Sequence, residues 1–200
     1  MNRYLAIAFV VAATSLAQAQ VTGAGFSAFH HPGFQTAQHC WIDFGTRDAD
    51  LSLYVFGWNQ PQPLAWLEGY LKKPLKLGSL NFTPGVFVAF AQGVRQTGPA
   101  FTLDGSGKNW SLFVTGSLIG EQGARPTLFI PAARLFLGEE RRLRFGLEGS
   151  YVTQSDWSQL RLGPVAAYQI ADNVTLRLAF LKGTRNGRGD ELRFTTVFRF

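Results

Sequence analysis

The chain of 200 residues is 46% hydrophobic and 14% aromatic, with a formal net charge of +6 and a single cysteine. One cysteine cannot form an internal disulfide, so the fold must be held together by backbone pairing and packing. No stretch beyond the N-terminal region approaches the length of a membrane-spanning apolar helix, which excludes that class. The 22 glycines and 18 phenylalanines favour strands and tight turns over helices.

Residues 1–19 are typical of a cleavable secretory signal peptide. Arg3 provides a positive start, residues 5–13 (LAIAFVVAA) form a short apolar stretch, and Ala17 and Ala19 fit the cleavage pattern. We therefore expect an exported protein whose mature chain begins at Gln20. An exported chain does not meet nucleic acid and its basic residues form no run, so the net positive charge favours an anionic lipid surface as the partner. We expect no cofactor.

The mature chain divides into an N-terminal segment at residues 20–37 and a barrel domain at residues 38–200. In the first half of the domain, the segments that read as strands are residues 51–58, 86–94, 110–119 and 128–137. Their two faces are not sharply distinct. Residues 64–82 and 97–109 are harder to assign to any element.

Two-residue alternation is clearest in roughly the last sixty residues, and it predicts strands with one apolar face. The apolar series consists of Leu143, Phe145, Leu147 and Tyr151, then Leu160, Leu162, Tyr168 and Ile170, then Val174, Leu176, Leu178 and Phe180, and finally Leu192, Phe194, Phe198 and Phe200. Turn residues at 171–173 and a loop at 184–189 that contains Asn-Gly separate these strands.

This pattern predicts an all-β fold, an up-and-down antiparallel β-barrel of about 8–10 strands. Two features conflict with it. Counting strands back from the C-terminus places the long 97–109 connection at the end where turns are usually short, and a further strand near residues 101–103 would remove that conflict. Pro131 and Pro164 lie inside predicted strands, where a missing backbone donor requires a bulge or different strand boundaries.

Alternation fits either a soluble barrel with an apolar interior or a membrane barrel with an apolar exterior. Strands of about ten residues cross the hydrocarbon layer, and the aromatic residues Trp110, Tyr151, Trp157 and Tyr168 lie near predicted strand ends. The ending, with Phe194, Phe198 and Phe200 on one face, resembles the terminal strand of bacterial outer-membrane proteins, whose size class includes the OmpA and OmpX barrels. The resemblance implies an assembly signal that is read by the barrel assembly machinery.

In a membrane barrel, the opposite face of these strands would line the lumen. The lumen set is Arg144, Glu148, Arg161, Arg177, Arg193 and Arg199. Buried charges must pair or meet water, and here arginines outnumber the carboxylates on the same strands. Either upstream carboxylates such as Asp43 and Glu68 also point inward and complete a structural charge network, or the lumen is a narrow, anion-attracting pore.

Other candidate sites are less specific. His30, His31, His39 and Cys40 are potential metal ligands, but their spacing matches no established zinc or copper signature, and a polar N-terminal segment that leads into the first strand is the better explanation. Lys182, Arg185 and Arg188 on a predicted outer loop are candidates for contact with lipid phosphates. No predicted strand carries a recognisable catalytic set, so an outer-membrane lipid-modifying enzyme is an unsupported alternative.

The sequence therefore predicts an integral outer-membrane β-barrel with a structural, surface-contact or narrow-pore role, exported by its signal peptide. The alternative is a soluble periplasmic or secreted barrel that holds an apolar ligand.

Overall fold

The computed structural model describes residues 19–30, 37–57, 64–91, 94–120, 127–138, 142–154, 157–183 and 189–200. The described residues form the strands β1 (Gln20–His30), β2 (Ala37–Gly45), β3 (Ala49–Gly57), β4 (Leu64–Leu71), β5 (Leu75–Leu77), β6 (Leu80–Ala91), β7 (Val94–Gly107), β8 (Trp110–Ile119), β9 (Thr127–Leu137), β10 (Leu143–Gln154), β11 (Trp157–Ala171), β12 (Val174–Gly183) and β13 (Glu191–Arg199). No helix within these ranges is long and apolar enough to cross a membrane.

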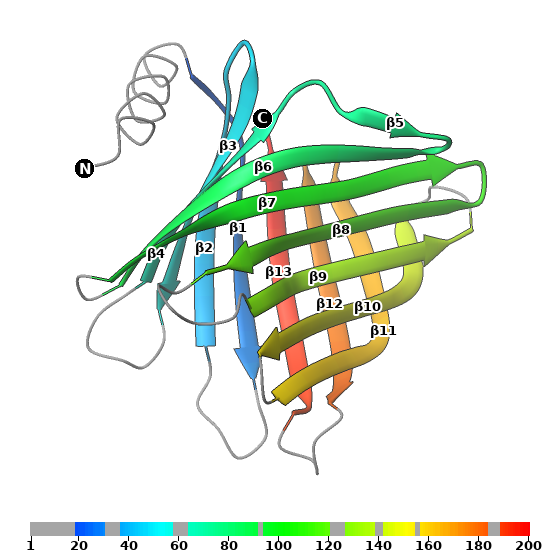
Figure 1. The fold of residues 1–200 in the computed structure, drawn as a ribbon. Coiled ribbons are helices and arrows are strands. Elements are labelled where there is room, and N and C mark those ends of the chain that lie inside the picture. The colour runs from blue at the N-terminus through cyan, green and yellow to red at the C-terminus, as the bar shows by residue number, and fades with distance from the viewer. Residues whose placement is uncertain are drawn as a thin grey trace.

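The strands close into an up-and-down antiparallel barrel. Neighbours along the chain pair with one another, β1 pairs with β13, and β4 pairs with β6, so twelve strands form the ring. The short β5 pairs with the beginning of β6 beyond that ring. Figure 1 shows β6–β10 crossing one wall, with β1, β2, β12 and β13 in the opposite wall. The all-β barrel is thus confirmed, and the ring has 12 strands instead of about 8–10.

The extra strands come from the segments whose pattern was weak. Residues 64–82 contain β4, β5 and the start of β6, and residues 94–107 form the single long strand β7. The turn after β7 is only Lys108–Asn109, so the expected strand near residues 101–103 exists and the long-connection conflict disappears.

The predicted boundary at residue 37 is wrong, because β1 already belongs to the ring. Its pairing runs from Gly23 opposite Arg199 to His30 opposite Leu192. The inward positions of β1 include Gly23, Gly25 and Ser27, which are too small to mark a face by hydropathy. The signal peptide prediction falls on residues 1–19, almost wholly outside the described residues.

Both prolines lie where the ladder is interrupted. At Pro131 the β9 register shifts against both neighbours, between Gly149 and Tyr151 on β10 and between Thr115 and Ser117 on β8. At Pro164 the pairing of β11 with β12 is interrupted from Leu162 to Val165 without a register shift. The bulge expected at Pro131 is confirmed, and Pro164 is accommodated by a local gap in the ladder.

The outer face of the barrel is apolar. Large hydrophobic side chains are exposed along most strands, including Phe26, Ile42, Leu53, Val86, Leu118, Phe145, Leu147, Leu162, Tyr168, Leu178, Phe180, Leu192, Phe194 and Phe198. The buried set is mixed, with Glu68, Glu148, Glu191, Arg193, Ser27 and Thr195 beside Trp66, Phe87 and Leu181. The outer face is therefore apolar, whereas the interior holds charged and polar side chains together with apolar ones.

Candidate functional site: the charged lumen

The wall formed by β9–β13 carries a connected set of inward-facing charges. Glu148 on β10 accepts a hydrogen bond from Arg193 Nη1 at 2.6 Å and another from Arg134 Nε at 3.3 Å. Glu191 Oε1 accepts from Arg193 Nε at 2.6 Å, and its Oε2 lies 3.7 Å from Arg161 Nε. These five side chains thus alternate in sign across the wall.

The contact between Arg193 and Glu148 spans three strand intervals, from β13 to β10. Arg193 pairs with Ala179, which pairs with Val165, and Glu148 pairs with Gly163. These inward positions carry small side chains or none. The guanidinium can therefore lie across β12 and β11 and reach the carboxylate.

Aromatic rings support the arginines. The Arg193 guanidinium lies 4.7 Å from the centroid of Phe29, and that of Arg134 lies 5.4 Å from the centroid of Phe113. Arg144 lies 4.9 Å from the ring of Phe136. Because a guanidinium is weakly hydrated and planar, it packs on aromatic faces at little cost.

Arg177 lies beside this network on β12. It faces the same interior, because it pairs with the buried Ala167 and Thr195, and it interacts electrostatically with Arg134, Glu148 and Arg193. Its Nε atom is buried and has no hydrogen-bond partner among the described residues. This wall therefore contains a guanidinium with unused donor capacity.

The adjoining wall, formed by β1–β4, is aromatic and carries its own carboxylates. His39 stacks on Phe29 with centroids 5.0 Å apart and lies 5.3 Å from Trp41, which in turn lies 6.2 Å from Tyr54. Glu68 is buried and accepts hydrogen bonds from the Trp66 indole at 2.8 Å and the Tyr70 hydroxyl at 2.7 Å.

Asp43 accepts a hydrogen bond from Ser52 at 2.6 Å. Asp43 and Glu68 both face inward, as the sequence analysis suggested. Within the described residues, however, they accept hydrogen bonds from polar neighbours on β3 and β4 and not from the lumen arginines.

The predicted lumen set is partly brought together. Glu148, Arg161 and Arg193 lie in the charge network, and Arg177 lies beside it. Arg144 is inward but packs on Phe136, and Arg199 is exposed at the end of β13.

Sequence reasoning missed Arg134 and Glu191. The bulge at Pro131 shifts the alternation of β9, which conceals the inward position of Arg134. Glu191 lies one residue before the predicted start of the last strand.

The metal candidates are not brought together. His39 faces the lumen, whereas Cys40, the next residue on β2, is exposed on the outer face. His30 is exposed at the end of β1, and His31 lies outside the described residues. In the described part of the chain, no group of three or more histidine, cysteine or acidic side chains could hold a metal ion.

The remaining candidates lie on the exterior. Lys182 Nζ contacts Asp190 Oδ2 at 3.0 Å and is exposed, while Arg185 and Arg188 fall outside the described residues. Phe194, Phe198 and Phe200 are all exposed on the outer face, as the predicted assembly signal requires. Whether the assembly machinery reads them stays a prediction.

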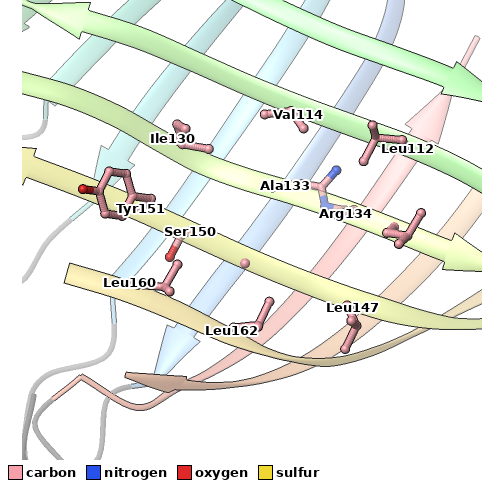
Figure 2. A pocket seen from close by; sticks show the side chains of 12 residues that line it. Leu112, Val114, Ile130, Ala133, Arg134, Leu147, Ser150, Tyr151, Leu160 and Leu162 are labelled. Carbon is pink, nitrogen blue, oxygen red and sulfur yellow. The ribbon is translucent and has the colours of Figure 1, made fainter. Parts of the chain in front are cut away.

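A hollow of about 320 Å³ lies on the outer wall across β8–β11. Figure 2 shows the apolar side chains around it, which include Leu112, Val114, Ile130, Leu147, Tyr151, Leu160 and Leu162. Gly149 pairs with Ala133 at its centre, so the absence of large side chains there produces the depression. Arg134 and Ser150 of the inner face also border the hollow, but most of its lining belongs to the apolar outer surface.

Comparison with known proteins places the fold. No protein-family model matches the chain, and no curated protein sequence matches it. Among solved structures, the KdgM porin in complex with disordered oligogalacturonate matches with a TM-score of 0.69 and 11% identity, covering 89% of this chain and 99% of that one.

The NanC porin matches with a TM-score of 0.64 and 12% identity, covering 90% of this chain and 98% of that one. Omp33, an outer-membrane protein of Acinetobacter baumannii, matches with a TM-score of 0.54 and 10% identity, covering 92% and 99% of the two chains. The chain has the fold of these porins. At such low identity the likeness concerns the fold alone.

Proposed function

We propose that the protein is an outer-membrane channel that admits small anionic solutes. The membrane assignment rests on the exposed apolar side chains that surround a polar interior, which is the reverse of a soluble barrel. The porin fold of the structural neighbours supports the same placement. In this orientation β1 begins, and β13 ends, on the periplasmic side.

The observation that carries the anion preference is the excess of arginine over glutamate on the β9–β13 wall, which the inward carboxylates of Asp43 and Glu68 on the adjoining wall reduce but do not reverse. The inward-facing charges of the β9–β13 wall are Arg134, Arg144, Arg161, Arg177 and Arg193, against Glu148 and Glu191. Rings of arginine or lysine are a general means by which pores select anions. Fixed positive charge in a low-dielectric wall attracts anions and repels cations.

Acidic saccharides are the solute class that this lumen suits best. The arginine wall can bind carboxylates, and the rings of His39, Trp41 and Tyr54 on the adjoining strands β2 and β3 offer flat faces to a sugar ring. The solved complex of the KdgM porin with oligogalacturonate, a chain of acidic sugars, supports this choice.

A pair of solutes of similar size tests the proposal. Liposomes that contain the purified protein should swell faster in galacturonate than in galactose, which lacks the carboxylate. Protein-free liposomes measure the background rate. Equal rates for the two sugars, or a faster rate for galactose, would contradict the proposed anion preference.

A structural barrel with a filled lumen is the second candidate. Its support is the packing of the interior, where the side chains of Glu148, Phe87 and Leu181 are at most 2% exposed. Such a barrel would hold its charges as a network and conduct nothing. Absence of swelling in both sugars, with the protein folded in the liposomes, would favour it.

A further inference from the structure

Glu148 occupies the position at which the lumen arginines would bind a permeating anion. Its two carboxylate oxygens are each engaged by one arginine, Oε1 by Arg193 and Oε2 by Arg134, and the residue is 2% exposed. Arg177 interacts electrostatically with the same carboxylate, but its buried Nε has no hydrogen-bond partner in the described ranges. Two guanidiniums thus bond to this carboxylate, and a third, that of Arg177, lies within electrostatic range of it.

This arrangement leaves positive charge uncompensated inside the barrel wall. A buried charge is costly unless an opposite charge or water offsets it, so the cluster favours the entry of a second anion. Tight binding would, however, trap a permeating solute. Conduction requires a site that binds strongly enough to admit the solute and weakly enough to release it.

We propose that Arg134, Arg177 and Arg193 form an anion-binding site in which Glu148 is a built-in competitor. This inference rests on the proposed anion channel, and it explains how the arginine site would release a bound solute. A solute carboxylate binds first to the spare donor of Arg177 and then exchanges with Glu148 for Arg134 and Arg193. When Glu148 returns to the two arginines, the solute is released.

The surrounding contacts allow this exchange without loss of the site. Arg193 stays anchored when Glu148 moves, because its Nε also donates to Glu191 at 2.6 Å and its Nη1 to the Pro131 carbonyl at 3.2 Å. The residue that pairs with Glu148 on β11 is Gly163, which has no side chain to confine the carboxylate on that side.

Block of chloride current by galacturonate in planar bilayers tests the inference. In Glu148→Gln the competitor loses its charge but keeps its shape, so the galacturonate concentration that halves the current should fall about tenfold, the value of one charge-assisted hydrogen bond. Glu68→Gln is the matched control, because this buried carboxylate bonds to Trp66 and Tyr70, and its half-blocking concentration should stay unchanged.

Arg177→Gln provides a second variant that leaves the bonds of Glu148 to Arg134 and Arg193 in place. Its half-blocking concentration should rise severalfold. An unchanged or higher half-blocking concentration in Glu148→Gln would overturn the inference. If Glu148→Gln does not assemble, an unchanged half-blocking concentration in Arg177→Gln would overturn it instead. A wild-type channel without anion current removes the proposed function and the inference together, whereas normal anion current with unaltered block removes only the inference.

Discussion

Arg193 Nη1 lies 2.6 Å from Glu148 Oε1, and this contact joins β13 to β10 across the inner surface of two intervening strands. Both side chains are at most 10% exposed. Removing one member of a buried pair leaves the other charge uncompensated, which is more costly than the pair itself is stabilising. The contact therefore ties the stability of the barrel to the same residues that give the lumen its charge.

Arg193→Met should destabilise the barrel by about 3 kcal/mol, because Glu148 and Glu191 both lose a buried partner. Urea unfolding of the protein in lipid vesicles measures the change. Lys182→Met is the control, since it breaks an exposed pair with Asp190 and should cost less than about 1 kcal/mol. Equal losses in the free energy of unfolding would show that the buried lumen pair contributes no more to stability than the exposed pair does.

Phe145→Arg tests the contact of the outer face with lipid. Phe145 is 63% exposed on the apolar face near the start of β10, and an arginine on the lipid face destabilises a barrel by about 2–4 kcal/mol at the bilayer midplane and by less towards the interfaces. We expect a corresponding loss in the free energy of unfolding in vesicles, with Phe145→Leu close to wild type. Wild-type stability of Phe145→Arg would mean that this face does not lie in hydrocarbon.

Gly25→Val should displace the indole of Trp41, its cross-strand partner. A Cβ atom at Gly25 would lie 2.0 Å from the Trp41 ring, so the ring or the strand must move. Overpacking of this kind costs about 1–3 kcal/mol, and the tryptophan fluorescence should shift. Gly120→Ala has open space around the new methyl and should leave both readouts unchanged.

Asp190 couples the loop between β12 and β13 to pH. The Gly183 N–H and the Lys182 ammonium hold the pKa of Asp190 below the usual 3.8. The folded pKa is depressed, so the contact is fully present above pH 3.8 and is lost as the pH falls through the lower folded value. Hydrogen exchange at the Gly183 amide should become faster in Asp190→Asn at neutral pH, and an unchanged rate would contradict the contact.

The sequence predicts the second half of this barrel better than the first. From Leu143 onward, large apolar residues alternate with polar ones, and the four predicted strands all correspond to strands of the structure. In β1 three of the inward positions are the small residues Gly23, Gly25 and Ser27, and in β4 both faces carry large side chains such as Trp66 and Leu67. Hydropathy cannot identify the faces of such strands, which explains the low strand count.

The residues of the candidate site could also be predicted only where alternation is regular. Arginines on the regular strands β11–β13 could be assigned to the lumen from alternation alone. Arg134 could not, because the bulge at Pro131 changes which residues of β9 point inward. The partners of each arginine also depend on the register of β10–β13, which brings Glu148 under Arg193 over a separation of 45 residues in the chain.

The reversal potential of the wild-type protein in a planar bilayer, under a potassium chloride gradient, tests the central claim most directly. A lumen lined by more arginine than glutamate should pass chloride in preference to potassium, and the sign of the potential should be that of an anion-selective pore. A potential of the opposite sign, or no current from protein that is folded and inserted, would contradict a basic channel through this barrel.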